Sequence, residues 1–306
     1  MAIFAHPDCC VQAEDLIGLR SRAVAFGQTR SRRRLAGVHS SRYRGRGMDY
    51  RESRHYQSGD DIRTMDWRIT ARTGHPHVKL FDEERERPIV VLVDFSPTLF
   101  FASRGAFKSV QAARLAALIG WSAIAHSDRI GALLFHGDVH RELPPAGGRR
   151  GQLRLIRALV EAGEPERGLA ATAHPGALIQ ALARLRRVAR PGSWVFLLSD
   201  FYNLTPDASH HLLRLGQHCT VTAVQLVDAL ELQPPPPGRY GVCNQARSGL
   251  IDTRLPAQRR HYQQHFQRQH QQIYHLLHQA GAALWQLRTD EDVATRLAAW
   301  LREGSA

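Results

Sequence analysis

The chain has 306 residues, enough for one large domain or two smaller ones with a sizeable core. A hydrophobic content of 43% and a charged content of 23% are those of an ordinary soluble globular protein. The net charge of +13 predicts an acidic partner, either nucleic acid, a membrane surface or an acidic protein.

The cysteines and the apolar runs indicate where the protein works. Cys9, Cys10, Cys219 and Cys243 form no CxxC pair, which favours reduced thiols over a disulfide framework or a zinc site. The N-terminus has no basic region followed by a long apolar one, so no signal peptide is expected. The longest apolar run, 115–125, is well short of the ~20 residues of a membrane span. We therefore expect a soluble, cytoplasmic protein.

The N-terminal part combines a short helix with a basic segment. Residues 13–27 have apolar side chains at helical spacing. Residues 20–54 hold eleven arginines against two acids, Asp49 and Glu52. These arginines either form an electrostatic footprint for nucleic acid or anionic lipid, or are solvated and paired with the acids of 60–86. We favour the second interpretation, because apolar and aromatic residues interrupt the run.

Residues 45–87 form a block dense in opposite charges, aromatic residues and glycines. Residues 77–81 alternate in the manner of an edge strand. We interpret the charges as buried Arg–Asp pairs that fasten this block to the following domain. Trp67, in the same block, is expected to belong to a core.

From residue 88 onward, strands alternate with helices. Continuous apolar runs predict buried strands at 88–94, 129–135, 193–198 and 220–227, and helices are expected at 106–125, 152–162, 175–188 and 210–218. This alternation predicts an α/β fold with a mostly parallel sheet and helices on both faces. The remaining expected elements are an edge strand at 138–143, a loop at 144–151, a hairpin at 239–254 turning at Ser248 and Gly249, a helix at 255–280, a strand at 283–287, and a helix at 290–303 capped by Thr289.

Three strand ends or loops offer oxygen ligands. Asp94, Ser96 and Thr98 follow the first buried strand, Thr172 precedes the helix at 175–188, and Asp200 follows the strand at 193–198. In a parallel sheet all three could lie at the carboxyl edge, and oxygen ligands select a hard cation such as Mg²⁺. The alternative is that the two acids cap the following helices and the hydroxyls satisfy backbone groups.

Several segments resemble one bacterial family. They are 47–50 (GMDY), 54–67 (RHYQSGDDIRTMDW), 71–74 (ARTG), 78–85 (VKLFDEER), 91–98, 128–135 (DRIGALLF) and 198–201 (LSDF). With them the chain resembles the bacterial domain-of-unknown-function family fifty-eight from about residue 40 to 300. The matching motif residues, with a structural or interaction role, are Asp49, Tyr50, Arg54, Tyr56, Gly59, Asp60, Asp61, Arg63, Asp66, Trp67, Arg72, Lys79, Glu84 and Arg85.

The resemblance implies a charged block, 1–86, followed by a von Willebrand factor A-like (Rossmann-like) domain, 87–303, with a hairpin insertion at 234–254. It also implies a metal-ion-dependent adhesion site for Mg²⁺ or Mn²⁺, whose ligands are Asp94, Ser96, Thr98, Thr172 and Asp200. Thr98 stands where the family has serine, and it keeps the hydroxyl. Members are associated with MoxR-type AAA+ ATPases, so the implied role is a non-enzymatic adaptor or co-chaperone that presents a client protein.

Two other functions remain open on the sequence. The first is nucleic-acid or anionic-surface binding through residues 20–54. The second is a metal-dependent hydrolase that uses Asp94 and Asp200, which we rank last because no candidate base or nucleophile lies near them in sequence. His261 and His265 have the i, i+4 spacing of a metal pair, but they lie on the polar flank of their helix and are expected to be solvated.

Overall fold

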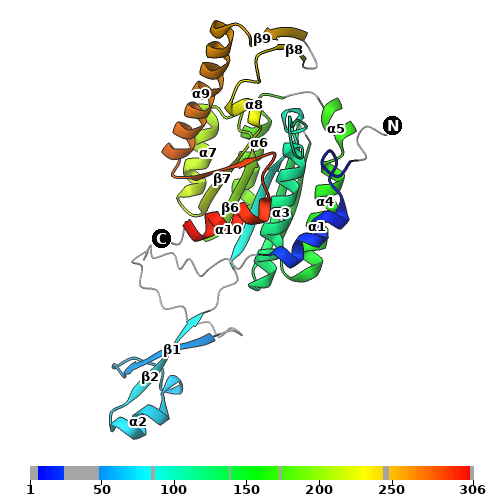
Figure 1. Ribbon diagram of the computed structural model, residues 1–306. Coiled ribbons are helices and arrows are strands. Elements are labelled where there is room, and N and C mark those ends of the chain that lie inside the picture. Colours follow the sequence, from blue (N-terminus) through cyan, green and yellow to red (C-terminus); the bar gives the residue numbers. More distant parts are fainter. Residues whose placement is uncertain are drawn as a thin grey trace. The chain divides into compact units, whose positions relative to one another are not determined.

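The computed structural model describes residues 6–23, 48–83, 87–137, 139–171, 174–243 and 248–303. They form two units, a larger one within residues 1–29 and 87–306 and a smaller one within residues 30–86 (Figure 1). None of the described helices combines the length and hydrophobicity needed to cross a membrane.

The smaller unit is a two-stranded antiparallel sheet with short helices between its strands. Strand β1 (Met48–His55) pairs with β2 (His77–Glu83), and η2 (Ile62–Thr64) and α2 (Trp67–Thr73) connect them. The predicted edge strand at 77–81 is confirmed as β2. The sequence prediction missed β1 and α2, because charges and glycines obscure any periodicity in this block.

The larger unit is built on a six-stranded sheet with the order β10-β7-β6-β3-β4-β5. The strands are β3 (Pro88–Asp94), β4 (Arg129–His136), β5 (Val139–Ala146), β6 (Trp194–Ser199), β7 (Thr220–Val227) and β10 (Ala283–Arg288). All neighbours are parallel except β4 and β5. When the strands of this sheet are numbered in chain order, the sequence across the sheet is 6-5-4-1-2-3, which is the order of a doubly wound α/β fold. The edge strand β5 is antiparallel to its neighbour. The predicted α/β class with a mostly parallel sheet is confirmed.

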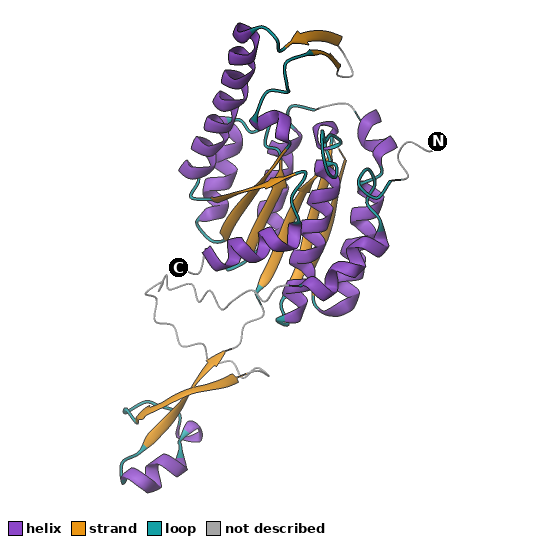
Figure 2. Ribbon diagram, viewed as in Figure 1, coloured by secondary structure: helices purple, strands orange, loops and turns teal. Residues whose placement is uncertain are grey.

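Helices cover both faces of this sheet (Figure 2). One face packs against α1 (Ala13–Gly18), η1 (Leu19–Arg22), α3 (Lys108–Ala125), α4 (Gly148–Ala162) and α10 (Val293–Glu303), and the other packs against α6 (Ala177–Val188), α7 (Pro206–Gly216) and α9 (Pro256–Gln279). Side chains of β3 alternate between the two cores: Val91 and Val93 face the first, and Val90 and Leu92 face the second. A strand buried on both faces explains the continuous apolar run.

The short elements complete the larger unit. They are η3 (Pro97–Leu99), α5 (Pro165–Ala170), α8 (Ala229–Leu232) and the hairpin of β8 (Arg239–Cys243) and β9 (Ser248–Asp252). The predicted hairpin is therefore present, but Ser248 and Gly249 lie within β9 and not at its turn. Figure 1 shows the hairpin at the N-terminal end of α9.

The first helix belongs to the larger unit, whereas the sequence grouped residues 1–86 into one segment. The side chain of Trp121 on α3 donates from Nε1 to the carbonyl of Leu16 at 2.9 Å. Arg114, also on α3, donates from Nε to Asp15 Oδ2 at 2.7 Å. Buried apolar contacts and these two polar ones tie α1 to α3, which separates it from the block at 48–83.

Two other local predictions are wrong. Strand β5 and helix α4 occupy most of residues 144–151, where a loop was expected. The cap of α10 is Asp292, which accepts a hydrogen bond from the Thr295 amide at 2.9 Å. Thr289 instead donates its hydroxyl to Asp228 at 2.8 Å, because the turn before α10 crosses the end of β7.

Candidate functional site at the carboxyl edge of the sheet

The two acids predicted to form a site come together because their strands are neighbours. β3 and β6 are parallel, and Val93 pairs with Leu198. Asp94, the last residue of β3, and Asp200, directly after β6, therefore reach the same edge of the sheet. Both are almost completely buried, at 5% and 2% exposure.

The carboxylate of Asp94 is held by backbone and hydroxyl donors. Its Oδ1 accepts from the Ser96 amide at 2.8 Å, and its Oδ2 accepts from the Ser199 hydroxyl at 2.6 Å. Burial, and then the negative charge of Asp200, raise the pKa of Asp94 to about 7. Ser199 was not predicted as part of the site, although it lies in the family-like segment 198–201, because it is the last residue of a buried strand.

Besides the Tyr202 hydroxyl, two buried oxygen atoms of predicted ligands at this edge have no hydrogen-bond partner in the described part of the chain. They are Oγ1 of Thr98, on η3, and Oδ2 of Asp200. The other oxygen of Asp200 accepts from the Tyr202 amide at 3.1 Å. Buried polar atoms are normally satisfied, so both atoms remain available as ligands at this edge. Thr172, the remaining predicted ligand, lies outside the described residues.

A buried lysine faces the same carboxylate. Lys108 is the first residue of α3, and its side chain is 1% exposed. Its Nζ forms an ion pair with Glu231 Oε1 and lies 3.8 Å from Asp200 Oδ2. It also lies 5.1 Å from the centre of the Tyr202 ring, a cation–π contact. No sequence pattern indicates a role for Lys108, because it begins a strongly apolar helix.

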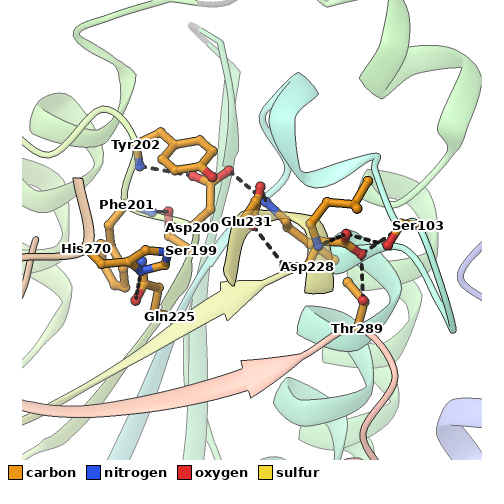
Figure 3. A network of polar contacts seen from close by, with 12 residues as sticks. Ser103, Ser199, Asp200, Phe201, Tyr202, Gln225, Asp228, Glu231, His270 and Thr289 are labelled. Carbon is orange, nitrogen blue, oxygen red and sulfur yellow. Dashed lines mark hydrogen bonds and ion pairs between the residues drawn. The ribbon is translucent and has the colours of Figure 1, made fainter. Parts of the chain in front are cut away.

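Glu231 is fixed by a capping box at the start of α8 (Figure 3). The Asp228 amide donates to Glu231 Oε2 at 2.8 Å, which leaves Oε1 for the lysine. Asp228 accepts from the hydroxyls of Ser103 at 2.6 Å and Thr289 at 2.8 Å. Burial alone would raise the pKa of Asp228, but these hydrogen bonds outweigh it and the pKa is lowered. The D-x-x-E spacing is the sequence signal that could have located this box.

The donor set suits a hard cation. All the predicted ligands offer oxygen, and Mg²⁺ prefers carboxylates, hydroxyls and water. Among the residues that the structure describes, no three His, Cys, Asp or Glu side chains form a metal-binding group. Any metal here would therefore depend on hydroxyls and water as well as on the two aspartates. Oγ1 of Thr98 and Oδ2 of Asp200, which accept no hydrogen bond, are oxygens of that kind.

A basic cavity adjoins the site. It has a volume of about 320 Å³ and lies between α9 and the loop that follows Asp200. Its lining includes Tyr202, His261, His265 and Arg268, and no acidic side chain. His261 and His265 are exposed, in keeping with the polar flank predicted for them, and both line this cavity.

The family-motif residues lie in the smaller unit, where they act mainly as local supports. Arg54 pairs with Asp60 at 2.7 Å, and Asp60 also accepts from the Gln57 amide at 2.9 Å. This pair joins β1 to the next turn within the unit, and the Arg54 side chain is 36% exposed. The expectation of a buried pair does not hold for it. Trp67 is 67% exposed, so its expected place in a core is also wrong.

The other motif residues support turns and helix starts. Asp66 accepts from the Ile69 amide at 3.1 Å and from the Ser53 hydroxyl at 2.9 Å, and it begins α2. Asp61 accepts from the Arg63 amide and begins η2. The amide of Tyr56 donates to the carbonyl of Pro76, and Gly59 has a left-handed φ of 107°. The remaining motif residues lie in regular elements: Arg72 at the end of α2, Lys79 on β2, and Asp49 and Tyr50 on β1. Glu84, Arg85 and most of the arginine-rich segment lie outside the described residues.

The fold and this edge site define an α/β protein with buried acids and hydroxyls at a topological switch of its sheet. The chain belongs to the family described as "Protein of unknown function DUF58", whose model matches residues 52–272. Its relatives include the uncharacterized protein Rv1480 of Mycobacterium tuberculosis and the uncharacterized protein Mb1516 of Mycobacterium bovis. Each is 31% identical over 261 residues, which cover 84% of this chain and 80% of the relative.

Two solved structures show weaker likeness. The conserved hypothetical protein BatB from Bacteroides thetaiotaomicron is 11% identical, with a TM-score of 0.43, over 72% of this chain and 98% of that one. A von Willebrand factor type A protein from Catenulispora acidiphila is 15% identical, with a TM-score of 0.37, over 75% of this chain and 43% of that one. The fold assignment rests on the strand order and pairing described above, and not on these two structures.

Proposed function

We propose that this protein is a non-enzymatic protein-binding adaptor with a metal-ion-dependent adhesion site at the carboxyl edge of its sheet. The ligands of Mg²⁺ or Mn²⁺ would be Asp94, Ser96, Thr98, Thr172 and Asp200, and the bound ion would take a carboxylate from a partner. The observation that supports this most is that the buried oxygens Oγ1 of Thr98 and Oδ2 of Asp200 have no hydrogen-bond partner, the second having only the charge of Lys108 3.8 Å away.

The electrostatics of the edge also support a bound cation. Two buried carboxylates from neighbouring strands repel each other, and this repulsion contributes to the raised pKa of Asp94. A divalent ion would relieve this repulsion. Because hydroxyls and water would complete its coordination, an anionic group of a partner could replace one of the waters.

The surroundings favour an acidic partner. The cavity beside Asp200 carries Arg268 and two histidines without any acid, and the whole chain has a charge of +13. By resemblance to the family, the partner we propose is a MoxR-type AAA+ ATPase, for which this protein would present a client. We place this role in the cytoplasm, where Cys9, Cys10 and Cys219 would remain free thiols, as they are in the structure.

The test uses a fluorescently labelled glutamate-rich peptide as the carboxylate probe, with anisotropy measured at physiological salt in Mg²⁺ and in EDTA. We expect binding in Mg²⁺ that EDTA abolishes. Thr98→Val should abolish it as well, because it removes one ligand without breaking any hydrogen bond. The control is Thr220→Val, at the amino end of β7, which loses only an exposed hydrogen bond from Arg87 and should bind as the wild type does. Equal binding in EDTA, or by the Thr98 variant, would mean that bulk charge alone attracts the peptide and would contradict the proposal.

A further inference from the structure

Lys108 is the one buried lysine or arginine side chain in the part of the chain that the structure describes. Burying an ammonium group is costly unless oxygen atoms surround it, and removing its partner would leave an uncompensated charge. Its position is set by the first turn of α3, which starts directly above the carboxyl edge. The local structure of α3 does not require a lysine there, because the apolar contacts of the helix come from the residues that follow.

The position of the ammonium is constrained from two sides. Glu231 holds it through Oε1, while its other oxygen is occupied by the Asp228 amide. Asp200 Oδ2 lies 3.8 Å away on the side of the proposed metal site. Asp228 is engaged by Ser103 and Thr289 and does not compete for the lysine. One cation is thus shared between a close glutamate and the aspartate of the site.

We infer that Lys108 is a resident counter-cation, which offsets the negative charge at Asp200 when no metal ion is bound and lowers the affinity of the site for divalent cations. This inference rests on the proposed function, because it concerns the regulation of the same site. Its physical basis is Coulombic: a divalent ion bound by Asp200 would lie a few ångströms from a fixed ammonium in a region of low dielectric. The consequence is a site that keeps its shape without metal and fills only at high metal concentration or together with an anionic partner.

The central variant replaces the pair by neutral side chains of similar size, Lys108→Met with Glu231→Gln. Glutamine can still accept from the Asp228 amide, so the capping box is kept. Lys108→Met alone would leave Glu231 buried and unpaired, which strongly destabilises the fold. Glu231→Gln alone is the matched control, because it retains the ammonium beside Asp200.

The first measurement is a calorimetric titration with Mn²⁺. We expect the double variant to bind at least about tenfold more tightly than the wild type, and Glu231→Gln not to gain affinity. Equal or weaker binding by the double variant would overturn the role of Lys108 and leave the proposed metal site intact. Absence of binding in every variant would contradict both the metal site and this inference.

The second measurement needs no metal, so it separates the two proposals. Asp200→Asn is introduced into the wild type and into the double variant, and urea midpoints are compared in EDTA. In the double variant, Asp200→Asn removes a carboxylate that only repels Asp94, whereas in the wild type it also removes the partner of Lys108. If Lys108 stabilises Asp200, Asp200→Asn should therefore change the free energy of unfolding more favourably in the double variant than in the wild type. The same shift of midpoint in both backgrounds would refute the counter-cation, whatever the metal titration shows.

Discussion

Asp94→Asn should stabilise the metal-free protein at pH 8. The pKa of Asp94 is raised from 3.8 to about 7, first by burial and then by Asp200. A shift of that size corresponds to roughly 4 kcal/mol of unfavourable free energy for holding the ionised carboxylate in the folded state. Asparagine removes the charge but loses the strong hydrogen bond from the Ser199 hydroxyl, so we expect a net gain of about 2 kcal/mol.

The pH dependence follows from the direction of the shift. Between about pH 4 and pH 7 the folded state binds this proton more tightly than the unfolded state does, so wild-type stability falls as the pH rises through this range. The gain from Asp94→Asn should therefore be largest at pH 8 and small at pH 4.

The assay is urea unfolding in EDTA, followed by tryptophan fluorescence at both pH values. Asp292→Asn is the control, and it should change the free energy of unfolding in the opposite direction. The hydrogen bond from Arg22 stabilises the ionised carboxylate of Asp292 and lowers its pKa. The substitution should destabilise at pH 8 and almost as much at pH 4, because the lowered pKa keeps Asp292 ionised in the folded state until the pH falls well below 3.8. An Asp94→Asn variant no more stable than the wild type at pH 8 would refute the electrostatic account of the site.

Two other predictions concern the framework around the site. Gly105 has a left-handed φ of 69°, and a Cβ there would lie 2.2 Å from the Thr289 carbonyl oxygen, so Gly105→Ala should lower stability by ~2 kcal/mol or more in the same urea assay. An unchanged midpoint would mean that this loop moves without cost. Asp66→Ala removes the cap of α2 and should cost about 1–2 kcal/mol in the smaller unit alone. Hydrogen exchange would then speed up in α2 but not in α3, and equal acceleration in both would contradict independent units.

The sequence was sufficient to predict the sheet and the meeting of its two acids. An apolar run such as that of β3 needs burial on both faces, and strands that alternate with helices run parallel. Asp94 and Asp200 could therefore be assigned to one edge before their strands were known to pair. Thr98 followed from its spacing after Asp94.

The rest of the site depends on long-range packing that no local pattern records. Lys108 reaches Asp200 only because α3 starts above β6, and Glu231 reaches Lys108 only because α8 caps the end of β7. In sequence, Lys108 is one charge at the start of an apolar helix. The smaller unit was harder to predict, because a strand such as β1 alternates charges with polar residues and has no apolar face to indicate it.

Mn²⁺ binding by the wild type and by Thr98→Val, measured by calorimetry with Thr220→Val as the control, tests the central claim most directly. We predict one ion per chain for the wild type and the control, and a loss of affinity of at least about tenfold for the Thr98 variant. Absence of binding up to about 10 mM, or equal binding by all three proteins, would contradict a metal-ion-dependent site at this edge.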